Sequence, residues 1–346
     1  MRPRLLRSAL ATLTATVAAA TCLTTTPASA AAPADTACSP SVTIEGYSDA
    51  LDKTTHDGVY VGNISALAVD RRGTLAALSD RSALFSLDGR TRAPRSVLPL
   101  ADENGAALDS EGLAVDRDGT YLISTEGEPA VRRYSRDGAI LARLPVPDAL
   151  RVTPAGRATP NGTFEGLTLL PNGRTLIAAM EYALTGDTPG TVRLQTWRRT
   201  APKGAFALGP QYAYRTDTGL GVPEITALPD GRLLVLERGF TAGTGNTVRL
   251  YLADPRRATD TSGVDHIVGG SGVRPITKTL LADLADCPDL GAPAHQPQVN
   301  PLLDNIEAMT VTGVRPDRLE VLLASDDNER ATQITRLYEL TVRVRR

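Results

Sequence analysis

One hairpin design occurs five times along this chain and constrains its fold more than any other feature. Each copy has an acidic or polar residue, a short apolar run, a turn, a second apolar run and a closing acid; the copies begin at Ser65, Glu111, Glu165, Glu224 and Glu307. Most turns contain Asp-Gly or Asn-Gly, as at 118–119 and 172–173. Short apolar runs on both sides of such a turn predict a β-hairpin. The chain is therefore expected to fold as a repeat.

The intervals between the copies fit the blades of a β-propeller. The copies begin 46, 54, 59 and 83 residues apart, and roughly 45 to 60 residues suit a four-stranded blade. The longest interval allows either a long insertion or a hidden blade. We predict an all-β fold, a six-bladed propeller with four-stranded antiparallel blades, in which the first strand (42–45) and the last (336–342) share one blade. The alternative, a pair of β-sandwiches, gives no reason for an acid to recur at one hairpin position.

The first thirty residues have the pattern of a secretory signal peptide. A basic start (Arg2, Arg4 and Arg7) precedes an uncharged stretch over 8–23, and small residues precede a cleavage point that we place after Ala30. A retained membrane helix is the alternative, and lipid attachment at Cys22 is a further one. We expect a secreted, extracellular protein with no membrane partner, made of an N-terminal segment (31–39) and a single domain (40–346).

Cleavage changes the charge and the cysteine count. Three of the 37 basic residues and none of the 39 acidic ones lie in residues 1–30, so the remainder carries a net charge of −5. Without a basic excess, no nucleic-acid partner is expected. Cys38 and Cys287 remain, and an even count in an oxidising compartment predicts a disulfide between them. Two buried free thiols are the alternative.

The repeated acids are the residues that we expect to carry the function. In an antiparallel hairpin the first residue of one strand faces the last residue of its partner, so both acids of a copy should lie at one end. The first strand of each propeller blade lines the channel, so the acids should gather at one mouth of that channel. We expect an inner ring of Glu111, Glu165, Glu224 and Glu307, surrounded by Asp80, Glu126, Glu181, Glu237 and Asp326.

Such a ring needs a compensating charge. Two like charges about 4 Å apart repel by roughly 4 kcal/mol at an effective dielectric near 20, and raised pKa values, arginines or a cation relieve that repulsion. Calcium suits hard oxygen ligands at variable distances, and Asn305 and Asn328 could add neutral ligands. Three histidines in the whole chain argue against zinc or iron. Alternatively, the acids form structural ion pairs, since Arg81 and Arg238 follow two of them, or accept backbone hydrogen bonds between blades.

Several motifs carry a resemblance to a known family. They are Glu-Gly-Leu before a hairpin, Leu-Glu-Arg-Gly-Phe at 236–240, Asn-Ile-Glu-Ala-Met at 305–309, Ser-Asp-Asp-Asn at 325–328, Gly-Tyr-Ser-Asp-Ala-Leu-Asp at 46–52 and Asn-Ile-Ser-Ala-Leu at 63–67. Over 40–342 the chain resembles the "esterase-like activity of phytase" family. The resemblance implies a secreted β-propeller with recurrent Glu and Asp that hydrolyses phosphoric esters with calcium.

By that resemblance, calcium held by the acids would bind phosphate oxygens. The candidates for contact with the substrate are Glu165, Glu307, Arg81 and Arg238. We expect a monomer that acts on a small phosphate ester or a similar molecule. A calcium-dependent lactonase or carboxyl-esterase is one alternative, and a non-catalytic extracellular binding propeller is another. A ring fully paired with arginines would favour the binding protein, and a site with open metal positions would favour an enzyme.

Overall fold

The computed structural model describes residues 36–201 and 203–344. The predicted signal peptide and Cys22 lie outside these residues. Within the described part of the chain, no helix is long and apolar enough to cross a membrane.

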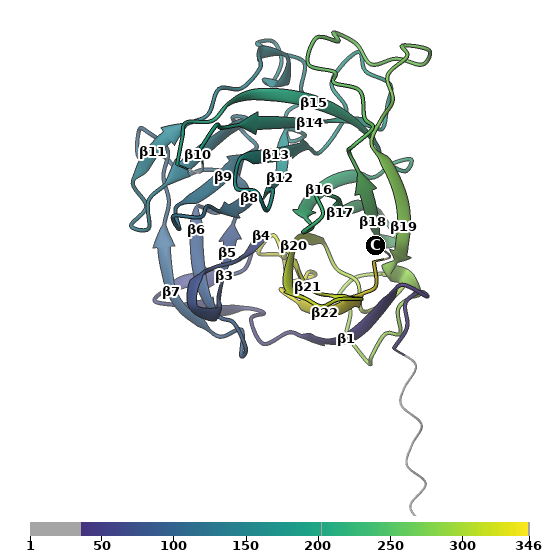
Figure 1. Cartoon of the computed structure of the whole chain (residues 1–346). Coiled ribbons are helices and arrows are strands. Elements are labelled where there is room, and N and C mark those ends of the chain that lie inside the picture. The colour runs from purple at the N-terminus through teal and green to yellow at the C-terminus, as the bar shows by residue number, and fades with distance from the viewer. Residues whose placement is uncertain (1–35, 202, 345–346) are drawn as a thin grey trace, which may run out of the picture. The chain divides into compact units, whose positions relative to one another are not determined.

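The described strands form five four-stranded antiparallel sheets, which stand as blades around one axis (Figure 1). The first two blades are β4 (Ile64–Val69), β5 (Thr74–Ser79), β6 (Ala83–Asp88) and β7 (Pro94–Pro99), then β8 (Ser110–Val115), β9 (Tyr121–Thr125), β10 (Ala130–Tyr134) and β11 (Ile140–Arg143). The next two are β12 (Phe164–Leu169), β13 (Thr175–Met180), β14 (Thr191–Arg198) and β15 (Ala207–Arg215), then β16 (Gly221–Ala227), β17 (Leu233–Thr241), β18 (Gly245–Asp254) and β19 (Thr277–Asp283).

The fifth blade closes the ring with strands from both parts of the chain. It contains β20 (Ile306–Val314), β21 (Leu319–Ser325), β22 (Leu337–Val342) and, as its outer strand, β1 (Val42–Ser48). Val42 lies opposite Val342 in an antiparallel pair. The predicted propeller, and the prediction that the first and last strands share a blade, are confirmed. A small hairpin, β2 (Thr54–His56) and β3 (Val59–Val61), and three 3₁₀ turns, η1 (Arg71–Gly73), η2 (Asp148–Leu150) and η3 (Leu284–Asp286), complete the described elements.

The prediction of six blades is wrong, because the described residues form five. The 83-residue interval between Glu224 and Glu307 contains no hidden blade. It is filled by two long strands, β17 with 9 residues and β18 with 10, by β19, and by the strand-free segments 255–276 and 287–305. Length alone does not separate a blade from an insertion of this kind.

The core lies between the blades. Buried apolar side chains form five clusters, and each cluster joins two neighbouring blades. Between the second and third blades, for example, Leu122 and Val131 pack with Leu176 and with Trp197, the single tryptophan. Each fully buried Leu or Val contributes roughly 1.5–3 kcal/mol, so every blade depends on both of its neighbours.

A disulfide links the fifth and fourth blades. Cys38, just before β1, is bonded to Cys287, just after β19, with an S–S distance of 2.04 Å. Both cysteines are buried in the same core cluster. The predicted pairing is confirmed.

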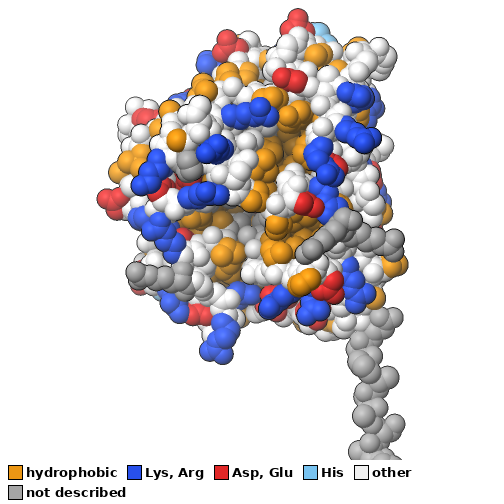
Figure 2. Space-filling model, in the orientation of Figure 1, with side chains coloured by type: hydrophobic (Ala, Val, Ile, Leu, Met, Phe, Trp, Pro, Cys, Tyr) orange, Lys and Arg blue, Asp and Glu red, His pale blue; other side chains and the backbone are white. Residues whose placement is uncertain are grey.

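The two ends of the ring differ in character. We call the end at which the inner strands β4, β8, β12, β16 and β20 begin the mouth, and the opposite end, which carries their hairpin turns, the turn face. Arginines stand in these turns, among them Arg71, Arg117, Arg174 and Arg318. Figure 2 shows the turn face, on which Lys and Arg side chains surround a hydrophobic hollow. A small cavity of about 120 Å³ lies between the inner strands.

Candidate functional site

A β-bulge interrupts the pairing at the mouth end of every inner strand. The register shifts between Ile64 and Ala66, Ser110 and Leu113, Phe164 and Leu167, Gly221 and Glu224, and Ile306 and Ala308. A bulge bends a strand and redirects the side chain within it. Glu111, Glu165 and Glu307 are bulge residues, so the local distortion is what aims these three carboxylates at the mouth.

A repeated backbone hydrogen bond places a second acid beside four of these bulges. The N–H groups of Asp80, Glu126, Glu181 and Asp326 donate to the carbonyls of Asn63, Asp109, Thr163 and Asn305, at 3.0, 3.0, 2.7 and 2.9 Å. Each acceptor stands two residues before the bulge residue of its own blade. In blades 2, 3 and 5 the second strand therefore ends with its acid next to the inner one, as the hairpin geometry predicted, whereas in blade 1 the bulge residue is Ser65.

Eight carboxyl groups gather at the mouth, and we call them the acidic cluster: Asp80, Asp109, Glu111, Glu126, Glu165, Glu181, Glu307 and Asp326. Carboxylate oxygens of Asp109, Glu111 and Glu126 lie within 4.8 Å of one another, and so do those of Glu126, Glu165 and Glu181. Glu126 belongs to both triads. The arrangement joins blades 2 and 3 through a continuous group of acids.

Two arginines form ion pairs with the acidic cluster within the described part of the chain. Arg238 lies 3.2 Å from Glu181 and 3.0 Å from Glu307. Arg81, whose side chain is 62% exposed, lies 3.5 Å from Asp80 at the edge. Among the described residues, no cation pairs with the other five acids, so the cluster is not an arginine-paired ring.

Burial and mutual repulsion raise the pKa values of these acids. For Glu111 and Glu165, loss of solvent is the main cause, and each is raised further by a neighbouring acid, Glu307 and Glu111 respectively, so both pKa values stand well above the usual range. Burial raises the pKa of Glu181 and of Glu307 to about 7, although Arg238 opposes the shift.

Two further acids of the cluster show the same behaviour. Burial raises the pKa of Asp80 to about 7, with the charge of Asp326 as the next cause. For Asp326, burial and the charge of Glu307 raise the pKa well above its usual range. Burial and mutual repulsion therefore both oppose ionisation of the whole cluster.

The structure places two predicted ring members, Glu224 and Glu237, elsewhere. The pairing register in blades 1 and 5 shows which positions face the mouth. Ala66 and Ala308, which directly follow the bulge residues, pair with Leu78 and Ala324. These two partners stand two positions before the closing acid of their blade. In blade 4 the matching pair is Glu224 with Leu236. Pro223 and Arg238 therefore occupy the positions that acids hold in blade 5. A shift of one residue turns a side chain to the other face of a strand.

Glu224 has a structural environment. It lines the small cavity between the inner strands, and its Oε1 accepts a 2.8 Å hydrogen bond from the N–H of Ile225. Burial raises its pKa well above the usual range, and hydrogen bonds from the N–H groups of Ile225, Leu167 and Met309 oppose the shift. This carboxyl group links three inner strands, as the alternative of backbone hydrogen bonding predicted.

Glu237 belongs to a separate ion-pair network. It is fully buried, and it accepts hydrogen bonds from Tyr214 Oη and the Asp217 N–H at 2.7 Å and from Lys278 Nζ at 2.5 Å. These partners lie between the third and fourth blades. Every acceptor oxygen of Glu237 is thus occupied within the fold.

The chemistry of the cluster fits a calcium ion. Its candidate ligands are all carboxylate oxygens, which suit calcium better than zinc or iron. Oε1 of Glu126 and Oδ1 of Asp80 are buried without a hydrogen-bond partner in the described structure. Of the neutral ligands predicted, Asn305 lies at the cluster and donates to Glu307 at 3.0 Å. The N–H of Asn328 donates to Asp326 at 2.8 Å.

The repeat pattern missed Asp109 and Tyr182. Asp109 stands two residues before Glu111, where the other blades have Asn63, Thr163 and Asn305, so the repeat gave no signal for an acid. Tyr182 follows Glu181 directly, and burial raises its pKa to about 12, with the charge of Glu181 as the next cause. Added Cβ atoms on Gly162 and Gly221 would lie 3.2 and 2.9 Å from its ring. Two glycines therefore leave room for this ring beside the cluster.

Comparison with known proteins identifies the family of this chain. The model of a phytase-like family described as "Esterase-like activity of phytase" matches residues 59–329. An "Uncharacterized secreted protein" of Arthroderma benhamiae is 26% identical over 180 residues, which cover 40% of this chain and 35% of that protein. The chain thus spans about a third of that relative's length.

Two solved structures show a distant likeness. Virginiamycin B lyase from Staphylococcus aureus is 9% identical, with a TM-score of 0.37 and coverage of 84% of this chain and 83% of that one. The Cps50 (Swd1) β-propeller domain of Myceliophteria thermophila is 14% identical, with a TM-score of 0.37 and coverage of 86% and 88%. Likenesses this distant carry no information on substrate or mechanism. The family match, in contrast, extends over more than half of the chain and includes all eight acids of the cluster and Arg238. The chain belongs to the phytase-like family described as "esterase-like activity of phytase".

Proposed function

We propose that this protein is a secreted, monomeric, calcium-dependent hydrolase that cleaves phosphoric esters at the acidic cluster. The observation that carries the proposal is the pair of carboxylate triads that share Glu126, of which no member but Glu181 has an ion-pair partner in the described structure. The family description supports ester hydrolysis. The pattern of residues 1–30 and the printed name of the relative support secretion.

The triads are the residues that would hold the metal. Asp109, Glu111, Glu126, Glu165 and Glu181 offer oxygens at the spacing that a shared site needs. Calcium bound there would offset their charge and polarise the oxygens of a phosphate group.

Arg238 is suited to hold the phosphate. Its side chain is mostly buried, and its Nε has no hydrogen-bond partner in the described structure. A charge-assisted hydrogen bond from that N–H to a phosphate oxygen would satisfy the donor. Arg81 at the edge of the cluster is a second candidate for this contact.

One acid outside the two triads is suited to proton transfer. A general acid or base works best when its pKa lies near the working pH. Glu307 belongs to neither triad, and burial raises its pKa to about 7. Its carboxyl group can therefore take a proton from a water molecule or give one to the leaving oxygen at neutral pH.

Phosphate release from 1-naphthyl phosphate, with calcium or with a chelator, tests this proposal. We expect activity with calcium, loss of activity with the chelator and recovery when calcium returns. Glu126→Gln should lower kcat/KM at least a hundredfold. Glu320→Gln, on β21 with a side chain that is 44% exposed, is the matched control and should retain activity. Full activity in the chelator would contradict the proposal, and hydrolysis of only lactones or carboxylic esters would favour the alternative enzyme.

A further inference from the structure

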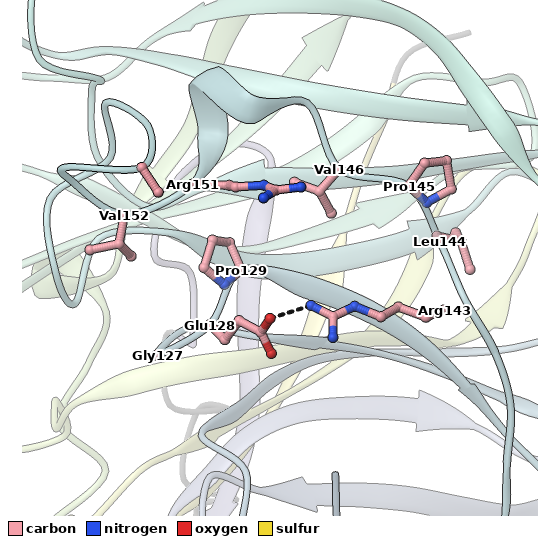
Figure 3. Close-up of a pocket in the computed structure, with 10 residues that line it drawn as sticks. Gly127, Glu128, Pro129, Arg143, Leu144, Pro145, Val146, Arg151 and Val152 are labelled. Atoms are coloured by element: carbon pink, nitrogen blue, oxygen red, sulfur yellow. Dashed lines mark hydrogen bonds and ion pairs between the residues drawn. The ribbon is translucent and has the colours of Figure 1, made fainter. Parts of the chain in front are cut away.

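A cavity opens at the mouth end of blade 2 (Figure 3). Its volume is about 630 Å³, and its lining comes from the β9–β10 turn, the end of β11 and the segment that follows. The turn contributes Gly127, Glu128 and Pro129, and residues 143–155 supply the rest of the lining. Cavities of roughly 300–1,000 Å³ are the size that holds small organic ligands.

This cavity adjoins the acidic cluster. Glu126 belongs to both triads, and the next residue, Gly127, lines the cavity. An added Cβ on Gly127 would lie 3.8 Å from both Cβ and Oδ2 of Asp109, another cluster member. The cluster and the cavity are therefore separated by one turn that has no side chain at that point.

Glu128 and Arg143, two charged residues that line the cavity, already have partners. Glu128 and Arg143 form an ion pair, drawn in Figure 3, and the buried Arg132 lies 3.0 Å from the other oxygen of Glu128. Arg132 also lies 3.0 Å from Glu103. This pair thus leaves no spare positive charge for a multiply charged ligand.

Most of the remaining lining residues are apolar, and one exposed cation, Arg151, stands among them. Pro129, Leu144, Pro145 and Val146 contribute the apolar surface, and Figure 3 shows Arg151 extending above Pro129 toward Val146. Arg151 pairs with Asp148 at 3.3 Å, but the two side chains are 55% and 85% exposed, so this ion pair is weak. The guanidinium of Arg151 is free to lie over an aromatic ring, an arrangement that attracts cations to π faces.

The negative charge of the mouth also favours a substrate with few phosphate groups. The acidic cluster has eight carboxyl groups and ion pairs with two arginines in the described structure. A substrate with many phosphate groups would need several unpaired cations outside the metal site. An ester with one phosphate and an apolar organic group needs none beyond Arg238.

We propose that the cavity binds the organic group of the substrate, and that the preferred substrates are monophosphate esters of an aromatic or similar flat apolar alcohol. This inference rests on the proposed function, because it places the phosphate at the acidic cluster. The phosphorus–oxygen bond would lie over the β9–β10 turn, with the phosphate at Glu126 and the ring between Pro129 and Arg151.

Paired substrates and a filled cavity test this inference. Ala155→Trp places a large side chain at the exposed rim, and Ala139→Trp, in the β10–β11 turn at the other end of the same blade, is the matched control. We expect Ala155→Trp to raise KM for 1-naphthyl phosphate at least tenfold, with kcat/KM for methyl phosphate within twofold of the unmodified protein. Arg151→Ala should raise KM for the naphthyl ester alone.

Three results would overturn the inference. They are equal effects of Ala155→Trp on both esters, no effect on either, or a higher kcat/KM for inositol hexakisphosphate than for 1-naphthyl phosphate. If no ester is hydrolysed at all, calorimetric binding of 1-naphthyl phosphate gives a separate reading. Binding that Ala155→Trp weakens and Ala139→Trp leaves unchanged would support the cavity as the binding site but contradict the hydrolase activity. Equal binding by both variants, or no binding, would contradict the proposed role of the cavity.

Discussion

Arg238 is the residue on which the charge balance of the mouth depends. It lies within 3.2 Å of Glu181 and 3.0 Å of Glu307, and its side chain is 16% exposed. In blade 4 it occupies the position at which blades 1, 2, 3 and 5 have an acid. The blade that departs from the repeat thus supplies the more buried of the two arginines that pair with the acidic cluster.

Replacing Arg238 with glutamine should make the protein depend more on calcium. Removing one partner of a largely buried pair costs about 3 kcal/mol, so we expect a lower melting temperature in a chelator. Because the added repulsion is relieved by a bound cation, the rise in melting temperature on adding calcium should exceed that of the unmodified protein. Differential scanning calorimetry with and without calcium measures both, and an unchanged calcium effect would contradict this role.

The raised pKa values of Glu181 and Glu307 give a pH dependence with a defined sign. A carboxyl group whose pKa is higher in the folded state stabilises the fold fully below its unfolded pKa and loses that contribution as the pH rises through its folded pKa. Both values rise from 4.5 to about 7. Without calcium, the stability advantage of the unmodified protein over a Glu181→Gln, Glu307→Gln double variant should therefore shrink between pH 5 and pH 8. Urea unfolding across that range measures it, and a growing advantage would show the sign to be wrong.

At the scale of elements, one bulge per blade decides which acids meet. Glu111, Glu165 and Glu307 stand in the bulges, whereas Glu224 is one residue beyond its bulge and lines the channel instead. The same offset turns Glu237 away from the mouth and toward Lys278. A one-residue difference in register thus converts two candidate ligands into structural groups.

Glu237 and the cluster acids should therefore respond differently to the same substitution. Glu237→Gln removes a buried charge that three groups contact, so we expect a loss of roughly 3 kcal/mol in the free energy of unfolding. Its calcium affinity should stay within twofold of the unmodified protein. Chemical denaturation measures the loss of stability, and a calcium titration on the same sample measures the calcium affinity. A large loss of calcium affinity in a folded variant would place Glu237 at the metal site.

The sequence predicted much of this element-scale order, and its failures have physical causes. Turn residues such as Asp118-Gly119 identified the hairpins, and the recurring acids predicted that Glu111, Glu126 and Glu165 would meet at one mouth. The prediction of a sixth blade was wrong because the length of an interval does not distinguish an extra blade from a strand-free insertion such as 255–276. Glu224 and Glu237 were misplaced because only their spacing marked the difference in register: they are 13 residues apart, whereas the paired acids of blades 2 and 3 are 15 and 16 residues apart. Asp109 was missed because no other blade has an acid at that position.

At the scale of the whole molecule, the ring is closed by chain segments far apart in sequence. β1 pairs with β22, and the disulfide between Cys38 and Cys287, which are 249 positions apart in the sequence, links that closing blade to blade 4. The formal net charge of −2 also conceals a separation of charge, with carboxyl groups at the mouth and arginines on the turn face (Figure 2). The closure keeps all five blades in contact around the cluster.

Removing the disulfide should weaken this closure. A cross-link over so long a loop restricts the unfolded chain strongly, and its loss typically costs about 2–5 kcal/mol. We expect a Cys38→Ser, Cys287→Ser double variant to unfold at lower denaturant concentration while it keeps its far-ultraviolet circular dichroism spectrum. An unchanged unfolding midpoint would mean that pairing of β1 with β22 closes the ring without the bond.

A calcium titration by isothermal calorimetry tests the central claim most directly. The unmodified protein, stripped of metal, should bind calcium with release of protons, because acids with raised pKa values must ionise to bind the ion. Glu126→Gln and Glu165→Gln should each weaken binding at least about tenfold, and Glu320→Gln should bind like the unmodified protein. No calcium binding by the folded, unmodified protein, or equal binding by all four proteins, would contradict the assignment of the acidic cluster as a calcium site.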